Sequence, residues 1–162
     1  MKTERIHLEY QVADSVTSLE ATDRNLVREA QLAQEKAYAP YSRYPVGAAL
    51  IREDGSIVPG NNQENAAYPS GLCAERVALF SASATLPNVA VKTIAIVAPS
   101  GEFDPAAPCG GCRQVLMEYE TKQGSPIRIL LKGDGENIWI FKSVHDLLPF
   151  SFTRERLKKE AK

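Results

Sequence analysis

The segment YPSGLCAERVALF, residues 68–80, places Cys73 two positions before Glu75 at the predicted start of a helix. A second segment, PCGGCRQVLMEY, opens another predicted helix with Cys109 and Cys112, which form a C-x-x-C pair. Together with Cys73 these are the three cysteines of the chain. Because the first backbone N–H groups of a helix have no partner inside it, both segments place thiols where α/β proteins bind ligands.

The composition of the chain is that of a globular protein with an ordinary core. Its 162 residues are 44% hydrophobic and 24% charged, and the formal net charge is −1. This charge offers no general attraction to nucleic acid or to an anionic membrane, so we expect neither as a partner. The first residues do not resemble a signal peptide, and no apolar run approaches about 18 residues, so we expect a cytoplasmic protein. Three cysteines in a reducing compartment are more typical of thiols or metal ligands than of disulfides.

Helical and extended patterns alternate along the chain. Apolar residues recur at helical spacing over residues 23–37, and Thr22 or Asp23 is suited to cap the start of that helix. Two extended segments around the turn Glu53-Asp54-Gly55 predict a hairpin. The remaining predicted elements are a helix over 72–84, a strand over 92–98, a helix over 109–121, strands over 126–132 and 137–143, and short helices over 144–150 and 154–162.

This order of elements predicts an α/β fold. Hairpin strands followed by alternating strands and helices typically build a mixed sheet with helices on both faces. We therefore expect a three-layer α/β/α sandwich around a sheet of about five strands, in a single domain over residues 1–162. Its parts are an extension over 1–20 with a short strand in IHLEYQV, a core over 21–152 and a tail over 153–162.

The three cysteines favour a catalytic metal over the alternatives. A C-x-x-C pair also fits a redox dithiol, but here it lies two-thirds of the way along the chain, unlike in thioredoxin-like proteins. A structural zinc site normally has four protein ligands, and His7 and His145 are better interpreted as a strand residue and a helix residue. Three ligands leave the fourth position to water, which zinc activates at neutral pH. Glu75 is then the candidate proton shuttle.

Charge balance points to a role for neighbouring arginines. Three thiolates around Zn²⁺ carry a net charge of −1, which weakens the metal as a Lewis acid. Two helix N-termini offset part of this charge. Arg76 and Arg113 each follow a site residue directly. Both are candidates to offset the remaining negative charge of the thiolates, and Arg76 is the stronger candidate.

The motifs C-x-E and P-C-x-x-C resemble the signature of the zinc-dependent nucleobase and nucleoside deaminases, in which His often takes the first position. The segments PYSRYPVGAAL, NNQENAAYPSGLCAERVAL, PCGGCRQV and LLPFSF narrow the resemblance. They are similar to successive blocks of the small, homotetrameric cytidine deaminases. The resemblance covers roughly residues 23–152, and it implies a cytidine deaminase-like fold.

The resemblance also implies roles for individual residues. It makes Cys73, Cys109 and Cys112 the ligands of one Zn²⁺ per subunit, and Glu75 the general acid and base. The other implied roles are ribose binding by Asn62 and Glu64, binding of the pyrimidine edge by the backbone of Ala74, packing beside the base by Tyr44, partial neutralisation of the thiolates by Arg76, and completion of a neighbouring subunit's site by Phe152.

The implied function is the hydrolytic deamination of cytidine and 2′-deoxycytidine in pyrimidine salvage. Two departures from the family pattern concern the substrate site: Gln63 stands where Ile is frequent, and Tyr44 where Phe is usual. One alternative is a deaminase of a cytosine-bearing antibiotic nucleoside of the blasticidin type. Another is a zinc-stabilised binding module without chemistry, against which the intact Glu75 and the count of three ligands argue.

Overall fold

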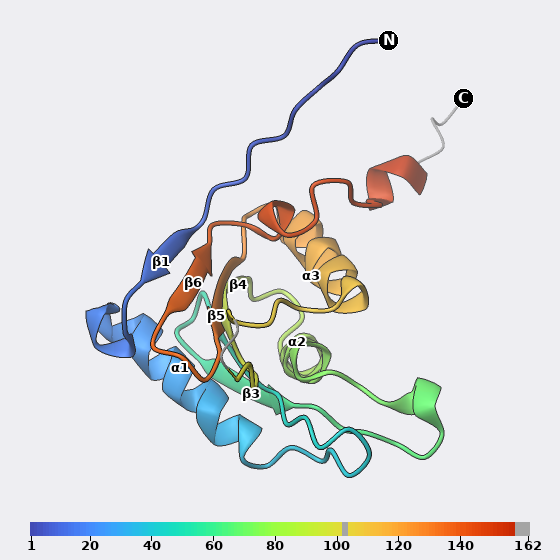
Figure 1. The fold of residues 1–162 in the computed structure, drawn as a ribbon. Helices are drawn as coiled ribbons and strands as arrows, with labels where there is room; N and C mark the ends of the chain where they lie inside the picture. Colours follow the sequence, from blue (N-terminus) through green and yellow to red (C-terminus); the bar gives the residue numbers. More distant parts are fainter. Residues whose placement is uncertain (102–103, 158–162) are drawn as a thin grey trace.

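The computed structural model describes residues 1–101 and 104–157, which form a six-stranded mixed sheet between layers of helices (Figure 1). The order across the sheet is β1-β6-β5-β4-β2-β3, and β4 and β5 are its parallel pair. The strands are β1 (Gln11–Ala13), β2 (Gly47–Arg52), β3 (Ile57–Asn61), β4 (Val91–Val97), β5 (Arg128–Lys132) and β6 (Ile138–Phe141). The predicted α/β/α sandwich is confirmed, with one strand more than expected.

The helices cover the two faces of the sheet unequally. Helix α1 (Ala21–Gln34) packs on one face, and α2 (Ala74–Thr85) and α3 (Gly110–Gln123) pack side by side on the other (Figure 1). Successive residues of a strand point to opposite faces, so β2 sends Ala49 towards α1 and Leu50 towards α2. The two resulting cores hold α2 and α3 in fixed positions at one side of the sheet.

The start of α1 differs from the prediction. The helix begins at Ala21, its N-cap is Glu20, and no side chain caps it. Asp23 therefore lies inside the first turn, where its carboxylate accepts two hydrogen bonds from the guanidinium of Arg128 at 3.2 and 2.8 Å. The prediction of a cap by Thr22 or Asp23 was wrong because a strand 105 positions away supplies a better partner for the carboxylate.

The extension at the start of the chain supplies the sixth strand. The predicted strand over residues 6–12 is shorter in the structure, because pairing with β6 begins at Gln11. Residues 1–10 leave the body as an extended arm (Figure 1). At the other end, the predicted helix over 144–150 is a 3-10 turn, η3 (Val144–Asp146), and the last predicted helix is η4 (Arg154–Leu157). The rest of that prediction, residues 158–162, lies outside the described part.

Two glycines allow helices to approach the sheet closely. A Cβ atom on Gly60 of β3 would lie 2.4 Å from the backbone nitrogen of Ala78 in α2. A Cβ atom on Gly47 of β2 would lie 2.0 Å from the carbonyl oxygen of Ala30 in α1. The depth at which α2 sits on the sheet therefore depends on the missing side chain at Gly60. Among the described residues, none of the helices combines the length and hydropathy of a membrane span.

Candidate metal centre

The ends of two helices bring the three cysteines together. Cys73 is the N-cap residue of α2 and Cys109 is the N-cap residue of α3, while Cys112 lies in the first turn of α3. Neither N-cap side chain is used to cap its helix, so both sulfurs remain available. Because α2 and α3 lie side by side with their N-termini at the same edge, the three Sγ atoms fall within 4.8 Å of one another.

The geometry of the sulfur cluster fits a zinc ion. A tetrahedral site with Zn–S bonds of about 2.3 Å requires sulfurs about 3.8 Å apart, and the Sγ atoms of Cys73 and Cys109 are separated by 4.0 Å. All three cysteines are free thiols, and soft sulfur ligands favour zinc over hard divalent cations. Across residues 1–101 and 104–157, no histidine or carboxylate joins the cluster as a fourth ligand. The donor set is therefore consistent with one zinc ion per chain, with a coordination position left open.

The electrostatics of the cluster prepare it for a cation. A hydrogen bond from the thiol of Cys112 lowers the pKa of Cys73 to about 5, and the neighbouring Arg76 guanidinium contributes further. The same bond and burial raise the pKa of Cys112 far above its ordinary value. Without a metal, one thiolate is thus stabilised at the expense of another. A divalent cation removes this conflict because it favours the charged form of all three sulfurs.

Glu75 occupies the first turn of α2 and is 4% exposed. Burial raises the pKa of its carboxyl group, and the charge of Cys73 contributes in the same direction. Within the described residues, its Oε2 atom is buried without a hydrogen-bond partner. A buried carboxylate oxygen without a partner is costly, so its retention beside the sulfur cluster is typical of a group that exchanges protons.

The two arginines next to the cysteines have different contacts. The Nη2 atom of Arg76 lies 3.7 Å from the Sγ atom of Cys73 and 3.5 Å from the carbonyl oxygen of Gly71. Arg113 instead donates from Nε to the carbonyl oxygen of Pro108 at 2.7 Å and from Nη1 to that of Leu147 at 3.0 Å. Arg76 therefore adds positive charge at the sulfurs, whereas Arg113 holds the backbone in front of α3.

The predicted ribose-binding residues hold a loop in this structure. The Oδ1 atom of Asn62 accepts a hydrogen bond from the backbone N–H of Val46 at 2.8 Å, and its amide donates to the carbonyl oxygen of Tyr44 at 3.0 Å. The Oε2 atom of Glu64 accepts from the backbone N–H groups of Tyr41 and Ser42 at 2.8 and 3.2 Å. Bonds from these two residues lower the pKa of Glu64. Both side chains thus fix residues 41–46, and Glu64 does so through its Oε2 atom alone among the described hydrogen bonds.

Tyr44 joins this loop to the one that precedes α3. Its hydroxyl donates to the carbonyl oxygen of Pro99 at 2.6 Å, and partial burial raises its pKa. Asp134 secures the same second loop, because its Oδ2 atom accepts from the backbone N–H groups of Ser100 and Gly101 at 2.7 Å each. Sequence reasoning missed Asp134, and the turn-forming run KGDGE after the strand over 126–132 is the signal that could have drawn attention to it. A hollow of about 360 Å³ lies here, lined by Tyr44, Pro99, Ser100, Gly101, Asp104 and Ala106.

Ala74 and Phe152 lie at opposite extremes of exposure. Ala74 is the first residue of α2 and is fully buried, so its backbone is at the helix start beside Cys73. Phe152 lies in the tail beyond η3 with 58% of its surface exposed. Its carbonyl oxygen accepts a hydrogen bond at 2.7 Å from the side chain of Gln114 in α3. The ring of Phe152 is therefore not packed into the core of its own chain.

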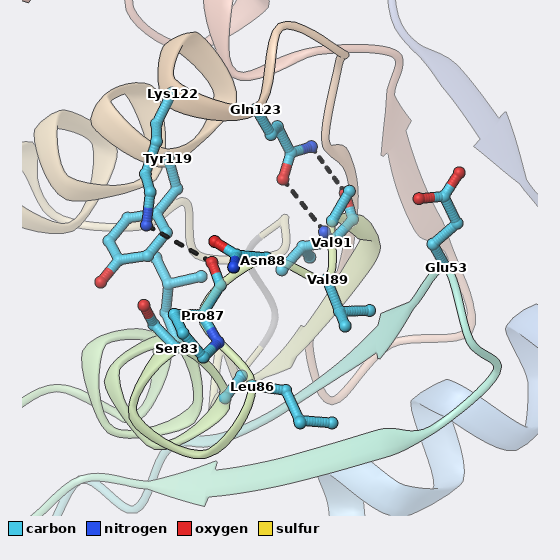
Figure 2. Close-up of a pocket in the computed structure, with 13 residues that line it drawn as sticks. Glu53, Ser83, Leu86, Pro87, Asn88, Val89, Val91, Tyr119, Lys122 and Gln123 are labelled. Carbon is cyan, nitrogen blue, oxygen red and sulfur yellow. Dashed lines mark hydrogen bonds between the residues drawn. The ribbon is translucent and has the colours of Figure 1, made fainter.

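A second hollow, of about 310 Å³, lies at the other ends of the same two helices (Figure 2). Gln123 of α3 closes it on one side, where its amide binds both the backbone N–H and the carbonyl oxygen of Val91. Lys122 reaches the carbonyl oxygen of Pro87 on the other side at 3.5 Å (Figure 2). Because the cysteines mark the N-terminal ends of α2 and α3, this hollow is separate from the metal centre.

Comparison with known protein families gives independent information on the class of protein to which this metal centre belongs. Residues 20–124 match the family model described as the cytidine and deoxycytidylate deaminase zinc-binding region. The chain is 43% identical to the cytidine deaminase of Sporosarcina psychrophila over 137 residues, which cover 84% of this chain and 95% of that protein. It is 45% identical to the cytidine deaminase of Halalkalibacterium halodurans over 130 residues, which cover 80% of this chain and 93% of that protein.

Solved structures agree with the sequence relatives. The crystal structure of cytidine deaminase from Burkholderia pseudomallei has a TM-score of 0.71 and 42% identity, and the match covers 79% of this chain and 97% of that one. The crystal structure of cytidine deaminase from Mycobacterium tuberculosis has a TM-score of 0.64 and 33% identity, with coverage of 82% and 98%. The similarity therefore extends over nearly the whole length of the two solved structures.

Proposed function

This chain belongs to the family of zinc-binding cytidine and deoxycytidylate deaminases, and on that basis we propose that it hydrolyses cytidine and 2′-deoxycytidine to uridine and 2′-deoxyuridine. The reaction consumes one water molecule and releases one molecule of ammonia. The observation that carries the proposal is the cluster of three cysteine sulfurs within 4.8 Å of one another at the starts of α2 and α3, beside the buried Glu75 in the first turn of α2. This combination supplies both a metal site and a proton carrier.

The metal is assigned to three thiolates, those of Cys73, Cys109 and Cys112. When bound, zinc supplies Lewis acidity, which makes water a competent nucleophile at neutral pH. The protein contributes the positions of the three sulfurs, which the packed N-termini of α2 and α3 fix in advance. Arg76 adds a guanidinium 3.7 Å from the sulfur of Cys73, so the electron density that the thiolates donate is partly offset.

Glu75 carries the protons of the reaction. Its Oε2 atom has no partner among the described residues, so it is free to take a proton from the attacking water. Glu75 then passes this proton to the ring N3, which makes C4 susceptible to attack. After the hydroxyl has added to C4, Glu75 takes the remaining proton of that hydroxyl and delivers it to the amino group. The C4–N bond then breaks, and ammonia leaves as the C4 carbonyl forms. Burial raises the pKa of the Glu75 carboxyl group. A raised pKa suits a group that acts as both general base and general acid, because such a group must accept and donate protons near neutral pH.

The nucleoside is assigned to the loops around Tyr44, Asn62 and Glu64. The hydrogen bonds of Asn62 and Glu64 fix residues 41–46, and we assign to these two side chains the 3′-hydroxyl of the ribose. Tyr44 lies beside the base, and the backbone of Ala74 binds the pyrimidine edge. Buried polar groups that a sugar hydroxyl satisfies reject ligands that lack it, so free cytosine should be a poor substrate. Cytidine and 2′-deoxycytidine both have a free 3′-hydroxyl, so we expect both as substrates. A nucleotide linked through its 3′-oxygen lacks this group, so we do not expect a polynucleotide as a substrate.

We also assign the completion of the site to a second subunit. Phe152 projects from the tail with 58% of its surface exposed, and Gln114 anchors its backbone to α3, the helix that bears two of the cysteines. A homotetramer in which Phe152 enters the site of a neighbour accounts for an exposed aromatic ring at an anchored position. In this proposal the catalytic core is residues 21–152, with an extension over 1–20 and a tail over 153–162. The free thiols suit a cytoplasmic location.

The decisive experiment follows the ultraviolet spectrum of cytidine and of 2′-deoxycytidine with the zinc-loaded protein, beside Glu75→Ala, with zinc counted in both. We expect conversion by the wild type only, with about one zinc per chain in both proteins. Bound zinc without loss of either nucleoside would overturn the substrate assignment. Cytosine-bearing antibiotic nucleosides are then the next substrates, and inactivity towards these too would leave a zinc-stabilised binding module.

A further inference from the structure

Residues 1–10 form an arm that leads into β1. The arm has the sequence pattern of a strand, but pairing with β6 begins only at Gln11. From Ile6 to Val12, apolar and polar residues alternate with the period of a strand that buries one face. The apolar members nevertheless remain open to solvent, since the exposed fractions are 56% for Ile6, 48% for Leu8, 44% for Tyr10 and 49% for Val12. An alternation of this length whose apolar side chains stay about half exposed in the monomer indicates a missing partner.

The backbone of the arm is also unpaired. Residues 1–9 make no backbone hydrogen bond to any other part of the chain that the structure describes, and the arm projects away from the body (Figure 1). β1 lies at one edge of the sheet, so its outer side and the arm beyond it present a row of free N–H and C=O groups. Such an edge is a template for a further strand.

The base of the arm is held rigidly. Gln11, Val12 and Ala13 pair with β6, and the ring of Tyr10 lies 4.9 Å from that of Trp139 and 5.3 Å from that of Phe141. These contacts fix where the arm leaves the body and which way its apolar side faces. The ordering entropy that a partner strand must overcome is smaller for a segment anchored at one end.

We propose that the arm pairs with the arm of a second copy of this chain, as an antiparallel strand pair centred on His7. The segment RIHLE, residues 5–9, is complementary to itself in this register. Arg5 of each copy faces Glu9 of the other, and Ile6 faces Leu8, so opposite charges meet on one side and apolar side chains on the other. Directly opposed pairs of both kinds stabilise antiparallel strands.

Charge selects this arrangement over its alternatives. In a parallel, in-register pair, Arg5 would face Arg5 and Glu9 would face Glu9, and like charges opposite one another are destabilising. A shift by one residue would place apolar side chains on the charged side. The arm pair uses residues outside the catalytic core, so it does not depend on the proposed activity, and it adds to any contact between the cores.

A cysteine at the centre of the pair tests the register. In the proposed pair the two His7 Cα atoms lie about 4.5–5.5 Å apart, inside the range that a disulfide spans. We expect zinc-loaded His7→Cys to form a covalent dimer under mild oxidation, seen on a non-reducing gel. Glu9→Cys is the matched control, because two copies of position 9 lie about 14 Å apart in this register. The wild type controls for the three native cysteines.

Charge reversal tests the complementarity in the same background. Adding Arg5→Glu to His7→Cys should reduce the yield of covalent dimer several-fold, and a further Glu9→Arg should restore it. Arg28→Glu, at an exposed position of α1, makes the same change in net charge and should leave the yield unchanged. Equal cross-linking of His7→Cys and Glu9→Cys, or none by either, would overturn the proposal. Deamination measured on the same samples reports separately on the catalytic core.

Discussion

The sulfur atoms of Cys73 and Cys109 lie 4.0 Å apart, although 36 positions of the chain separate them. The distance is set by two helices that pack on the same face of the sheet with their N-termini at one edge. The packing of α2 and α3 therefore brings together thiols from distant parts of the chain.

Replacement of Glu75 by Gln should remove activity while leaving the metal in place. The amide keeps the size of the side chain but cannot carry a proton, so turnover should fall by about 10²- to 10⁴-fold. Glu118→Gln, on the exposed side of α3, is the control and should match the wild type. The measurement is initial rate together with zinc per chain. Activity within twofold of the wild type would remove Glu75 from the mechanism.

Replacement of Cys109 by Ser should release the metal. This sulfur is exposed, so the substitution leaves no cavity in the core, and its effect on stability comes through the lost ion. With free zinc at 100 to 1,000 times its dissociation constant, the free energy of unfolding should fall by about 3–4 kcal/mol. Denaturant unfolding measured with and without a chelator checks this value. Chelation should lower the stability of the wild type and leave that of the variant unchanged.

Replacement of Arg76 by Gln should change the pH at which zinc is lost. The guanidinium lowers the pKa of Cys73, so its removal raises that pKa, and protons then compete with the metal at higher pH. The midpoint of zinc release on acidification should move upwards by up to about one pH unit. A zinc-sensitive dye followed during titration gives this midpoint. Arg28→Gln on α1 is the control, and a shift of equal size in that variant would mean that net charge alone is responsible.

Replacement of Tyr44 by Phe should loosen the loop that precedes α3. The change removes the 2.6 Å hydrogen bond to the carbonyl oxygen of Pro99 and keeps the ring, so stability should fall by about 0.5–1.5 kcal/mol. Amide exchange at Ser100 and Gly101 should become faster, while Tyr68→Phe, at a position 85% exposed, should change nothing. We expect KM to rise more than kcat falls, because the loosened loop belongs to the proposed nucleoside site while the proposed contact of the ring with the base is kept. Unchanged exchange would show that Asp134 alone holds the loop.

Replacement of Gly60 by Ala should damage both stability and metal binding. The new Cβ atom would lie 2.4 Å from the nitrogen of Ala78, so α2 must shift, and overpacking of this kind costs about 1–3 kcal/mol. Gly47→Ala crowds α1 on the opposite face and should cost stability without weakening zinc binding. Gly135→Ala meets no atom within 4 Å and is the neutral control. Equal zinc affinity in the Gly60 and Gly47 variants would contradict this account.

Much of the architecture followed from residue patterns. The Ala- and Leu-rich helix and the apolar strand KTIAIVA were found within two residues of their ends, because burial on one or both faces leaves a clear period. Among the features that did not follow are the ion pair of Asp23 with Arg128 and the short extent of β1. Both depend on partners more than 100 positions away, which local periodicity does not report.

The candidate site also combines features that local sequence patterns predict with features that depend on distant parts of the chain. The clustering of the three cysteines could be predicted from their spacing, because the chemistry of a catalytic zinc restricts which residues can stand at a helix start. The role of Glu75 stays a prediction. The hydrogen bonds of Asn62 and Glu64 to residues 41–46, and those of Asp134 to Ser100 and Gly101, could not be predicted. They join loops from separate parts of the chain, and polar residues in loops carry no periodic signal.

The pairing of β1 with β6 has a consequence for the order in which the protein is made. Gln11 is synthesised 129 residues before its partner Ile140. Until then β2, β3, α2 and β4 can assemble while the first segment waits without its neighbour. The pairing of β1 with β6 therefore follows the synthesis of all these elements, and the aromatic contact of Tyr10 with Trp139 offers a fluorescence signal for its formation.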